Sequence, residues 1–307
     1  MNIAQANSME SEPISPAPPS PTRPLLWSVR RELWENRSIY LAPLITMAVL
    51  LFGFLMSTRG LPGRRRAVLL LDEAHQRMAI TPLYGMAAFA IIVTAFFVGV
   101  FYCLDALSGE RRDRSILFWK SLPVSDLTTV LSKTIVALVA LPLVACAAII
   151  ITQVFMALIT AVVLLVNGMG TASFVPQLKF FPSPLLQLYS VIVIALWHAP
   201  IYGWALLVSG WARRATFLWA VMPLLAIAAI ERMAFETTHF MAFLKYRVGG
   251  WFAEAFAFKG HESLALDPVT QMTPGHFLSL PALWLGLLFF AICLFAAVRL
   301  RRYRGPT

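Results

Sequence analysis

Residues 105–126 read DALSGERRDRSILFWKSLPVSD and separate two long apolar segments. Their charged residues surround a compact apolar group made of Ile116, Leu117, Phe118 and Trp119. A loop that faces only water does not need such a group, whereas exposed aromatic side chains framed by Arg and Lys are typical of a contact to another protein. The segment is therefore predicted to bind a partner on one side of a membrane.

The composition indicates a membrane protein with one membrane domain. Hydrophobic residues make up 59% of the 307 positions, charged residues make up 13%, and the mean hydropathy is strongly positive. Soluble globular chains do not combine these properties. The net charge of +10 comes from short basic runs beside the apolar segments. We therefore expect these runs to anchor and orient the chain, and we expect no nucleic-acid partner.

Six apolar segments predict an all-α membrane protein with six transmembrane helices. They are residues 39–56, 83–104, 134–166, 185–208, 217–230 and 278–298. The third exceeds the ~30 Å hydrocarbon core and has Pro142 as its only breaker, so we expect one long helix that is tilted or protrudes. The fifth would cover only about 21 Å. Either its helix ends inside the membrane, or Glu231 and Arg232 lie at its outer rim.

The N-terminal part precedes the six-span domain, which is assigned to residues 38–307. Residues 1–24 are rich in Pro and Ser and are expected to form a disordered cytosolic tail. They lack the pattern of a cleaved signal peptide. Residues 25–37 are amphipathic, with Trp27 and Trp34 on the apolar arc, which predicts an interfacial helix. A simple cytosolic extension of the first span is the alternative.

The distribution of basic residues predicts the orientation. An even number of spans places both termini on one side, and fifteen of the 25 Lys and Arg residues then share that side. Such an excess favours cytoplasmic termini. Residues 105–126 are therefore expected to face the cytosol.

Residues 231–276 are predicted to form an external segment. The segment is too apolar for a free loop and too interrupted for a span, so we expect short re-entrant or interfacial helices. Glu231 and Arg232 are candidates for an outer gate, with Glu231 either reaching water or pairing with Arg232 or Arg247. An ordinary interfacial carboxylate at a helix end is the alternative.

His198 lies well inside the fourth span, beside Pro200. Ionisable residues inside a membrane are often functional, so His198 is a candidate pathway residue. A neutral histidine whose hydrogen bonds are satisfied by a neighbouring helix is equally compatible with the sequence.

No pattern in the chain indicates catalysis. The sequence contains no G-x-x-x-x-G-K-[ST] phosphate loop. His261 and Glu262 lack the second histidine of a zinc-protease motif, and Glu236 with His239 is a single i, i+3 pair. The three cysteines fall inside spans. We therefore predict no catalytic, cofactor or metal site in this chain, and we expect that it is not an enzyme.

The loop and its surroundings resemble a known family. The order of interfacial helix, two spans, charged loop and third span, together with Glu110, Ser115-Ile116, Leu122-Pro123-Val124-Ser125 and Lys133, is similar to the permease subunits of type-2 ABC exporters. Arg114 stands where that family usually has Gly, and Ser132 precedes Lys133 in place of Gly. The six-span layout and the external segment extend the resemblance over nearly the whole chain.

The resemblance implies a permease of the bacterial inner membrane. It would pair with a second permease copy, expected to be identical, and with cytosolic ATP-binding subunits that hold ATP and Mg²⁺. The loop would be a coupling helix, with Phe118 and Trp119 as anchors and its charged residues setting the register. The predicted partner-binding residues are Glu110, Arg112, Asp113, Arg114, Ile116, Leu117, Phe118 and Trp119.

Two other functions remain open at this point. One is a membrane-embedded enzyme that uses Glu231, Glu236 and the external histidines. The other is a membrane scaffold subunit that transports nothing. The aromatic residues of the loop could also sit simply in the lipid headgroup region.

Overall fold

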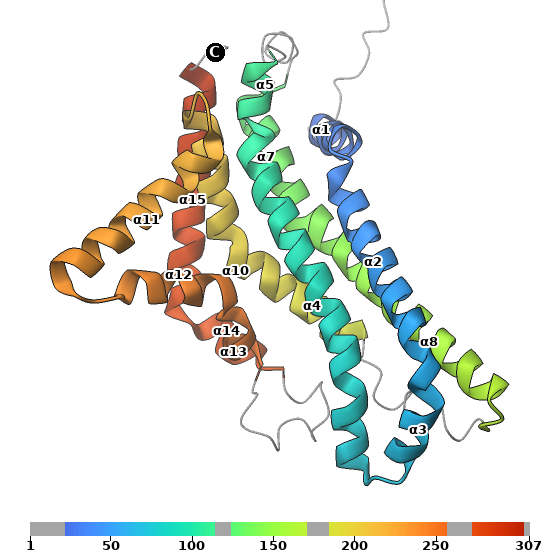
Figure 1. Cartoon of the computed structure of the whole chain (residues 1–307). Coiled ribbons are helices and arrows are strands. Elements are labelled where there is room, and N and C mark those ends of the chain that lie inside the picture. The colour runs from blue at the N-terminus through green and yellow to red at the C-terminus, as the bar shows by residue number, and fades with distance from the viewer. Residues whose placement is uncertain (1–21, 114–123, 171–183, 257–271, 304–307) are drawn as a thin grey trace, which may run out of the picture.

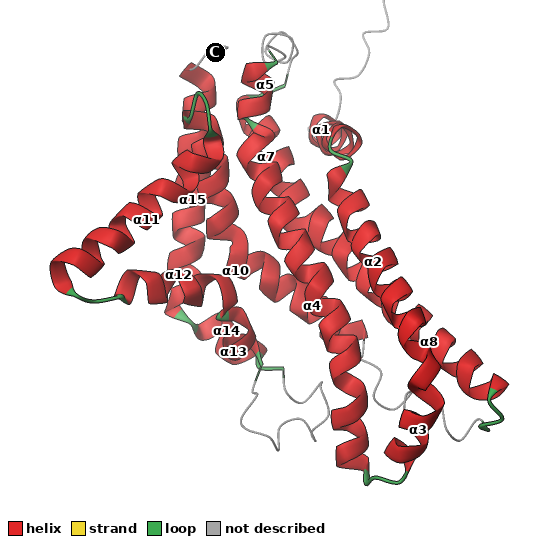
Figure 2. Ribbon diagram, viewed as in Figure 1, coloured by secondary structure: helices red, strands yellow, loops and turns green. Residues whose placement is uncertain are grey.

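The computed structural model describes residues 22–113, 124–170, 184–256 and 272–303, which are almost entirely helical (Figures 1 and 2). The elements are α1 (Thr22–Glu35), α2 (Ser38–Ser57), η1 (Thr58–Gly60), α3 (Leu61–Leu69), α4 (Glu73–Ala106), α5 (Ser108–Arg112), α7 (Asp126–Ile135), η2 (Val136–Ala140), α8 (Leu141–Val166), α10 (Pro184–Trp211), α11 (Thr216–Phe235), α12 (His239–Gly249), α13 (Trp251–Ala255), α14 (Pro274–Ser279) and α15 (Pro281–Tyr303). Within these residues, the only extended pairing is the isolated bridge between Phe256 and Met272.

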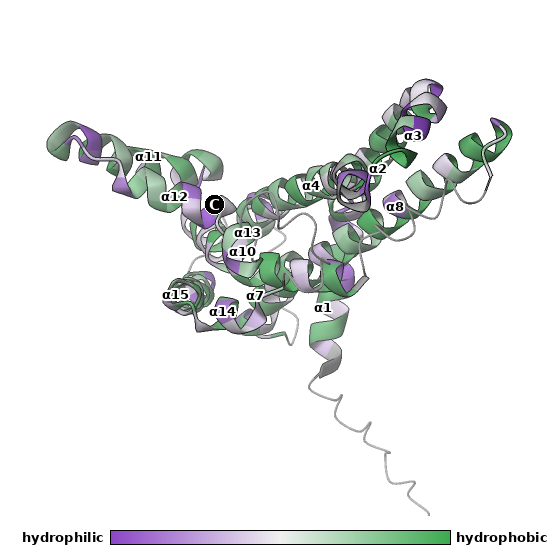
Figure 3. Ribbon diagram, turned by 90° about the horizontal axis from the view of Figure 1, so that it is seen from below, coloured by the Kyte–Doolittle hydropathy of each residue, from purple (hydrophilic) through white to green (hydrophobic). Residues whose placement is uncertain are grey.

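Six helices of the described chain are long and apolar enough to cross a membrane. They are Ser38–Leu69, Pro82–Arg112, Asp126–Val166, Leu185–Trp211, Thr216–Phe235 and Pro281–Tyr303. Apolar residues cover the outward faces of α2, α8 and α11, as Figure 3 shows. Large side chains such as Phe52 and Val162 are exposed there. Apolar surface on this scale is expected of helices surrounded by lipid. The predicted all-α fold with six helices long and apolar enough to span a membrane is confirmed for the described residues.

The N-terminal helix α1 lies across the end of α2, with a turn at Asn36 and Arg37 between them (Figure 1). A helix was predicted over residues 25–37, and the structure has one at nearly those positions. Its Val29 and Leu33 pack against the core of the bundle. Whether α1 lies in a membrane interface stays a prediction.

The second span is longer than predicted. The sequence places its end at Leu104, followed by a loop, but α4 continues to Ala106 and α5 extends the helical structure to Arg112. Between α4 and α5, the N–H groups of Leu107 and Ser108 donate to the Ser209 hydroxyl of α10.

The third span is one continuous helix of 41 residues, as predicted. At 1.5 Å per residue it is roughly 60 Å long, about twice the hydrocarbon core. A π-helical turn, η2, interrupts it just before Pro142. Proline has no N–H and its ring collides with the carbonyl four residues earlier, so a widened turn relieves the strain at this position.

Helix α10 is the centre of the bundle and packs against α4, α8 and α15. Two glycines permit the close approach of α10 to α4 and to α15. A Cβ atom at Gly99 of α4 would lie 2.8 Å from the Tyr202 hydroxyl, and one at Gly203 of α10 would lie 2.6 Å from the Phe290 ring. Small residues at such contacts let membrane helices gain van der Waals packing, which replaces the hydrophobic driving force they lack.

Helices α11 and α12 form an arm that leaves the bundle and returns to it, while α13 and α14 lie near the start of α15 (Figure 1). Of the two alternatives for the fifth helix, the structure agrees with the one in which Glu231 and Arg232 lie on the helix, because α11 continues through them to Phe235. Charged residues carried on a helix end do not terminate it, since the helical backbone bonds are satisfied within the segment. The short helices expected in residues 231–276 are present as α12, α13 and α14.

Helix α1 and the C-terminal end of α15 lie at the same end of the molecule, together with α5 (Figure 1). This agrees with an even number of spans. The cytoplasmic assignment of this end remains a prediction.

Candidate functional site

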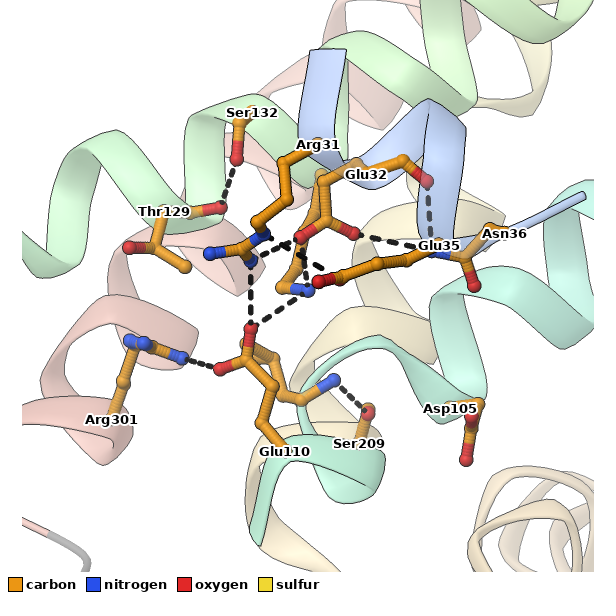
Figure 4. A network of polar contacts seen from close by, with 12 residues as sticks. Arg31, Glu32, Glu35, Asn36, Asp105, Glu110, Thr129, Ser132, Ser209 and Arg301 are labelled. Atoms are coloured by element: carbon orange, nitrogen blue, oxygen red, sulfur yellow. Dashed lines mark hydrogen bonds and ion pairs between the residues drawn. The ribbon is translucent and has the colours of Figure 1, made fainter. Parts of the chain in front are cut away.

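A cluster of buried charges joins four helices at the end of the molecule that carries α5 (Figure 4). We call it the charge cluster. Its members are Arg31 and Glu32 of α1, Glu110 of α5, Asp126 and Lys133 of α7, and Arg301 of α15. The cluster lies where α5 and α7 flank residues 114–123, the segment with the predicted anchors.

Glu32 is the most deeply buried member, with a side chain that is 1% exposed. Its Oε1 accepts from Lys133 Nζ at 2.8 Å and from Arg31 Nη2 at 2.7 Å. Its Oε2 accepts from the Tyr102 hydroxyl at 3.0 Å and, more weakly, from Asn36 Nδ2 at 3.5 Å. The carboxylate of α1 is therefore bonded to both α4 and α7.

Lys133 bridges two carboxylates. Its side chain is 3% exposed, and its ammonium lies 2.8 Å from Glu32 Oε1 and 3.0 Å from Glu110 Oε1. Lys133 occurs near the start of the apolar third span, so its methylene groups pack among apolar residues while its charge meets two acceptors. This single side chain links α1, α5 and α7.

Glu110 and Asp126 also hold Arg301 of the last helix. Arg301 Nη1 donates to Glu110 Oε2, and Arg301 Nε donates to Asp126 Oδ1 at 3.0 Å. Arg31 Nη2 lies 3.5 Å from Glu110 Oε1. The C-terminal end of α15 is thereby fixed to both helices that flank residues 114–123.

The charges of the cluster balance, with three cations and three carboxylates. Balance matters because a buried ion is costly unless it is paired and its hydrogen bonds are satisfied. Glu35 lies at the edge of the cluster, 3.5 Å from Arg31. Partial burial raises the pKa of Glu35, and the neighbouring Arg31 opposes that shift.

A second set of contacts fixes α5 to α10. The Ser209 hydroxyl accepts from the backbone N–H groups of Leu107 and Ser108, at 2.9 and 3.0 Å. The buried guanidinium of Arg111 donates to the carbonyl oxygens of Ser209 and Ala212. Glu110 and Arg111 therefore hold the short helix α5 from two sides, which leaves it little freedom to move on its own.

The predicted partner-binding residues have different surroundings. Glu110 is buried, and its carboxylate is committed to partners within this chain. Arg112 and Asp113 are exposed at the end of α5. The remaining predicted residues, Arg114, Ile116, Leu117, Phe118 and Trp119, lie outside the described residues.

Trp27 and Trp34 of α1 are both exposed on the side away from the bundle. The guanidinium of Arg30 lies over both rings, 5.7 Å and 4.8 Å from their centres. Glu32, which the sequence places on the polar arc with Arg31, instead points into the charge cluster. The helical pattern identifies a polar face, but it does not show that this face contacts other charged helices.

Glu231 makes contacts that the sequence does not predict. Its carboxylate accepts hydrogen bonds from the N–H groups of His239 and Phe240 and from the Thr237 hydroxyl, all at 2.8 Å. No Glu231 pair with Arg232 or Arg247 occurs in the described structure, where Arg232 donates to the Glu236 carbonyl oxygen. Glu231 thus caps the start of α12, where free N–H groups favour a negative charge.

His198 is buried between α10 and α12. Its Nδ1 lies 2.8 Å from the Ile194 carbonyl oxygen, and its Nε2 lies 3.1 Å from that of Val248. These are contacts to its own helix and to a neighbouring one. Its role as a pathway residue stays a prediction.

No group of three or more His, Cys, Asp or Glu side chains in the described ranges could hold a metal ion. The charge cluster itself has no free cation or carboxylate positioned for acid-base chemistry, since each of its charges meets a partner of opposite sign. It can hold helices in a fixed relation to one another.

Sequence reasoning did not identify Glu32, Arg301 or Tyr102 as site residues. The one usable signal was an ionisable residue, Lys133, at the edge of an apolar span, because such a residue usually has a partner inside the protein. Comparison of the chain with models of known protein families and with curated proteins finds no match in either.

Proposed function

We propose that this chain is the membrane permease subunit of an ATP-driven exporter of the type-2 ABC class. One observation carries the proposal. The two helices that flank residues 114–123, α5 and α7, are fixed by buried ion pairs to α1 and α15, and Ser209 and Arg111 also fix α5 to α10. A force applied to that segment would therefore reach α1, α10 and α15.

A separate subunit would supply the energy. The chain has no phosphate loop, so ATP and Mg²⁺ would bind to a cytosolic partner that docks on residues 105–126. Phe118 and Trp119 would anchor this contact, with Arg112 and Asp113 at its rim, where exposed charges influence register more than affinity. A second copy of the chain would complete the transport path within the bacterial inner membrane.

Neither alternative function has an observation in its favour. A membrane-embedded enzyme would use Glu231, but the Glu231 carboxylate already accepts three hydrogen bonds at or just before the start of α12. If the chain were a scaffold subunit that transports nothing, weakening the contact at residues 105–126 would cause no loss of transport.

The test is a double substitution of Phe118 and Trp119 by Ala, with the chain purified from its native membrane and its partners identified by mass spectrometry. We expect the wild type to carry an ATP-binding subunit, and we expect the variant to lose it, because truncating buried aromatic anchors costs more than about 2 kcal/mol of binding. The matched control replaces Trp27 and Trp34 by Ala. Normal partner binding by the Phe118/Trp119 variant, or ATP hydrolysis by the isolated chain, would contradict the proposal.

A further inference from the structure

A groove of about 530 Å³ runs between α2 and α4, beside the charge cluster. Its lining residues are Asn36, Ser38, Thr94, Phe97, Val98, Phe101, Tyr102 and Asp105. The six that belong to α4 follow the i, i+3, i+4 spacing of a single helix face, and they span about 16 Å. The volume falls in the range of roughly 300–1,000 Å³ that is usual for small-molecule sites.

The wall of the groove is aromatic. Phe97 and Phe101 are each 54% exposed. Phe101 stacks against Phe217 of α11, with ring centres 5.9 Å apart. At the end far from the charge cluster, the Thr94 hydroxyl contacts that of Thr46 at 3.1 Å, which joins α4 to α2. The groove therefore offers the half-exposed rings of Phe97 and Phe101 to an apolar ligand.

The opposite end of the groove is polar and carries one charged lining residue, Asp105. In Figure 4, Asp105 lies apart from the charge cluster. Among the described residues, Asp105 pairs with Arg112 at 3.6 Å, and the Asp105 and Arg112 side chains are 62% and 71% exposed. Exposed pairs of this kind contribute little, and Arg112 also contacts Asp113. The Asp105 carboxylate is therefore available to a ligand.

We propose that this groove binds lipophilic cations. An apolar or aromatic body would lie along Phe97 and Phe101, and its positive charge would be balanced by Asp105. The ring faces add a second attraction, because aromatic quadrupoles favour a neighbouring cation. Neutral lipid chains would gain the apolar contacts without the charge term, so charge complementarity selects the cation.

Two lining residues connect the groove to the charge cluster. Asn36 donates to the carboxylate and to the backbone carbonyl of Glu32, and Tyr102 donates to the carboxylate. An occupant of the groove would therefore touch the side chains that hold Glu32 in place. The inference does not depend on the proposed transport function, since binding can be measured on this chain without an ATP-binding subunit.

The experiment uses the full chain in nanodiscs of zwitterionic lipid, with radiolabelled tetraphenylphosphonium as the probe. Tetraphenylborate, which has the same shape and the opposite charge, is the matched comparison ligand. We expect saturable binding of the cation, and an affinity roughly tenfold lower for Asp105→Asn. Glu236→Gln, which removes an exposed carboxylate that is outside the groove and does not contact Arg112, should bind the cation as the wild type does.

Thermal unfolding of each variant checks that a lost signal does not come from a misfolded chain. Absence of saturable cation binding to the folded wild type would overturn the proposal, as would equal affinity in the wild type and Asp105→Asn. Saturable binding of tetraphenylborate with the same affinity would also overturn it, because the groove would then be a nonselective apolar site. None of these results bears on whether the chain couples to an ATPase.

Discussion

The buried charge of Lys133 is compensated by two carboxylates, and the same ammonium compensates the charges of those carboxylates. Its ammonium is almost fully buried between Glu32 and Glu110. Removing one member of a buried charged group costs much more than the group contributes as a whole, because an uncompensated charge remains. Single and paired substitutions should therefore behave differently in this cluster.

Lys133→Met should lower the free energy of unfolding by about 3–5 kcal/mol, because it leaves three carboxylates facing two cations. Adding Glu32→Gln restores the balance and should recover part of the loss. Denaturant unfolding of the purified chain in detergent measures both effects. Asp113→Asn is the control and should change stability by less than about 0.5 kcal/mol, as is usual for exposed positions. A Lys133→Met chain as stable as the wild type would show that the cluster is not charged as described.

At the scale of elements, the arm formed by α11 and α12 depends on Glu231 at its tip. The carboxylate satisfies two backbone N–H groups at the start of α12 that would otherwise lack intrahelical acceptors. A cap of this kind contributes about 1 kcal/mol. A substitution at Glu231 should therefore destabilise the start of α12.

Glu231→Gln should open the first turn of α12 more often, because a neutral amide is a weaker acceptor and does not favour the positive end of the helix. We expect hydrogen exchange at the amides of His239 and Phe240 to become about fivefold faster, which corresponds to about 1 kcal/mol. Glu236→Gln changes a nearby carboxylate that makes no such contact to α12 and should leave these rates unchanged. Unchanged exchange in Glu231→Gln would remove the capping role and return attention to an outer gate.

The packing of α10 against α15 provides a second element-scale prediction. Gly203→Val would place a branched side chain where a Cβ atom alone lies 2.6 Å from the Phe290 ring. Overpacking of a close contact typically costs 1–3 kcal/mol, so this variant should unfold at a lower temperature. Gly53→Val is the matched control, because a Cβ atom at Gly53 meets no heavy atom within 4 Å. Equal melting temperatures for the two variants would contradict the close helix contact.

Hydrophobic length and composition were enough to predict the six helices and the continuous third span, because these follow from local sequence. The end of the second span was not predicted, because the helical residues beyond Leu104 depend on contacts to α10. The charge cluster was not predictable for the same reason: Arg301 lies 191 positions from Glu110, and Lys133 lies 101 positions from Glu32. No local pattern reports which charged residues of crossing helices meet.

The molecule has one end at which ion pairs fix several helices to one another, and an arm, formed by α11 and α12, that makes few contacts with the rest. The charge cluster joins α1, α5, α7 and α15 at the end shared by the N-terminal helix and the C-terminal helix, whereas α11 is mostly exposed (Figure 1). In the proposed function, the rigid end receives force from an ATP-binding subunit and transmits it to the helices. This function requires a separate ATPase that contacts this end of the molecule.

Photo-cross-linking from the end of α5 would detect this contact in living cells. A photoreactive amino acid replaces Asp113, which is exposed beside residues 114–123, and the products formed in living cells are identified by mass spectrometry. The same probe at Met233, exposed near the end of α11, is the control. We predict that position 113 forms an adduct with a protein that contains a phosphate loop, and that position 233 does not. Adducts with lipid alone at position 113, at native expression and with the chain correctly inserted, would contradict it.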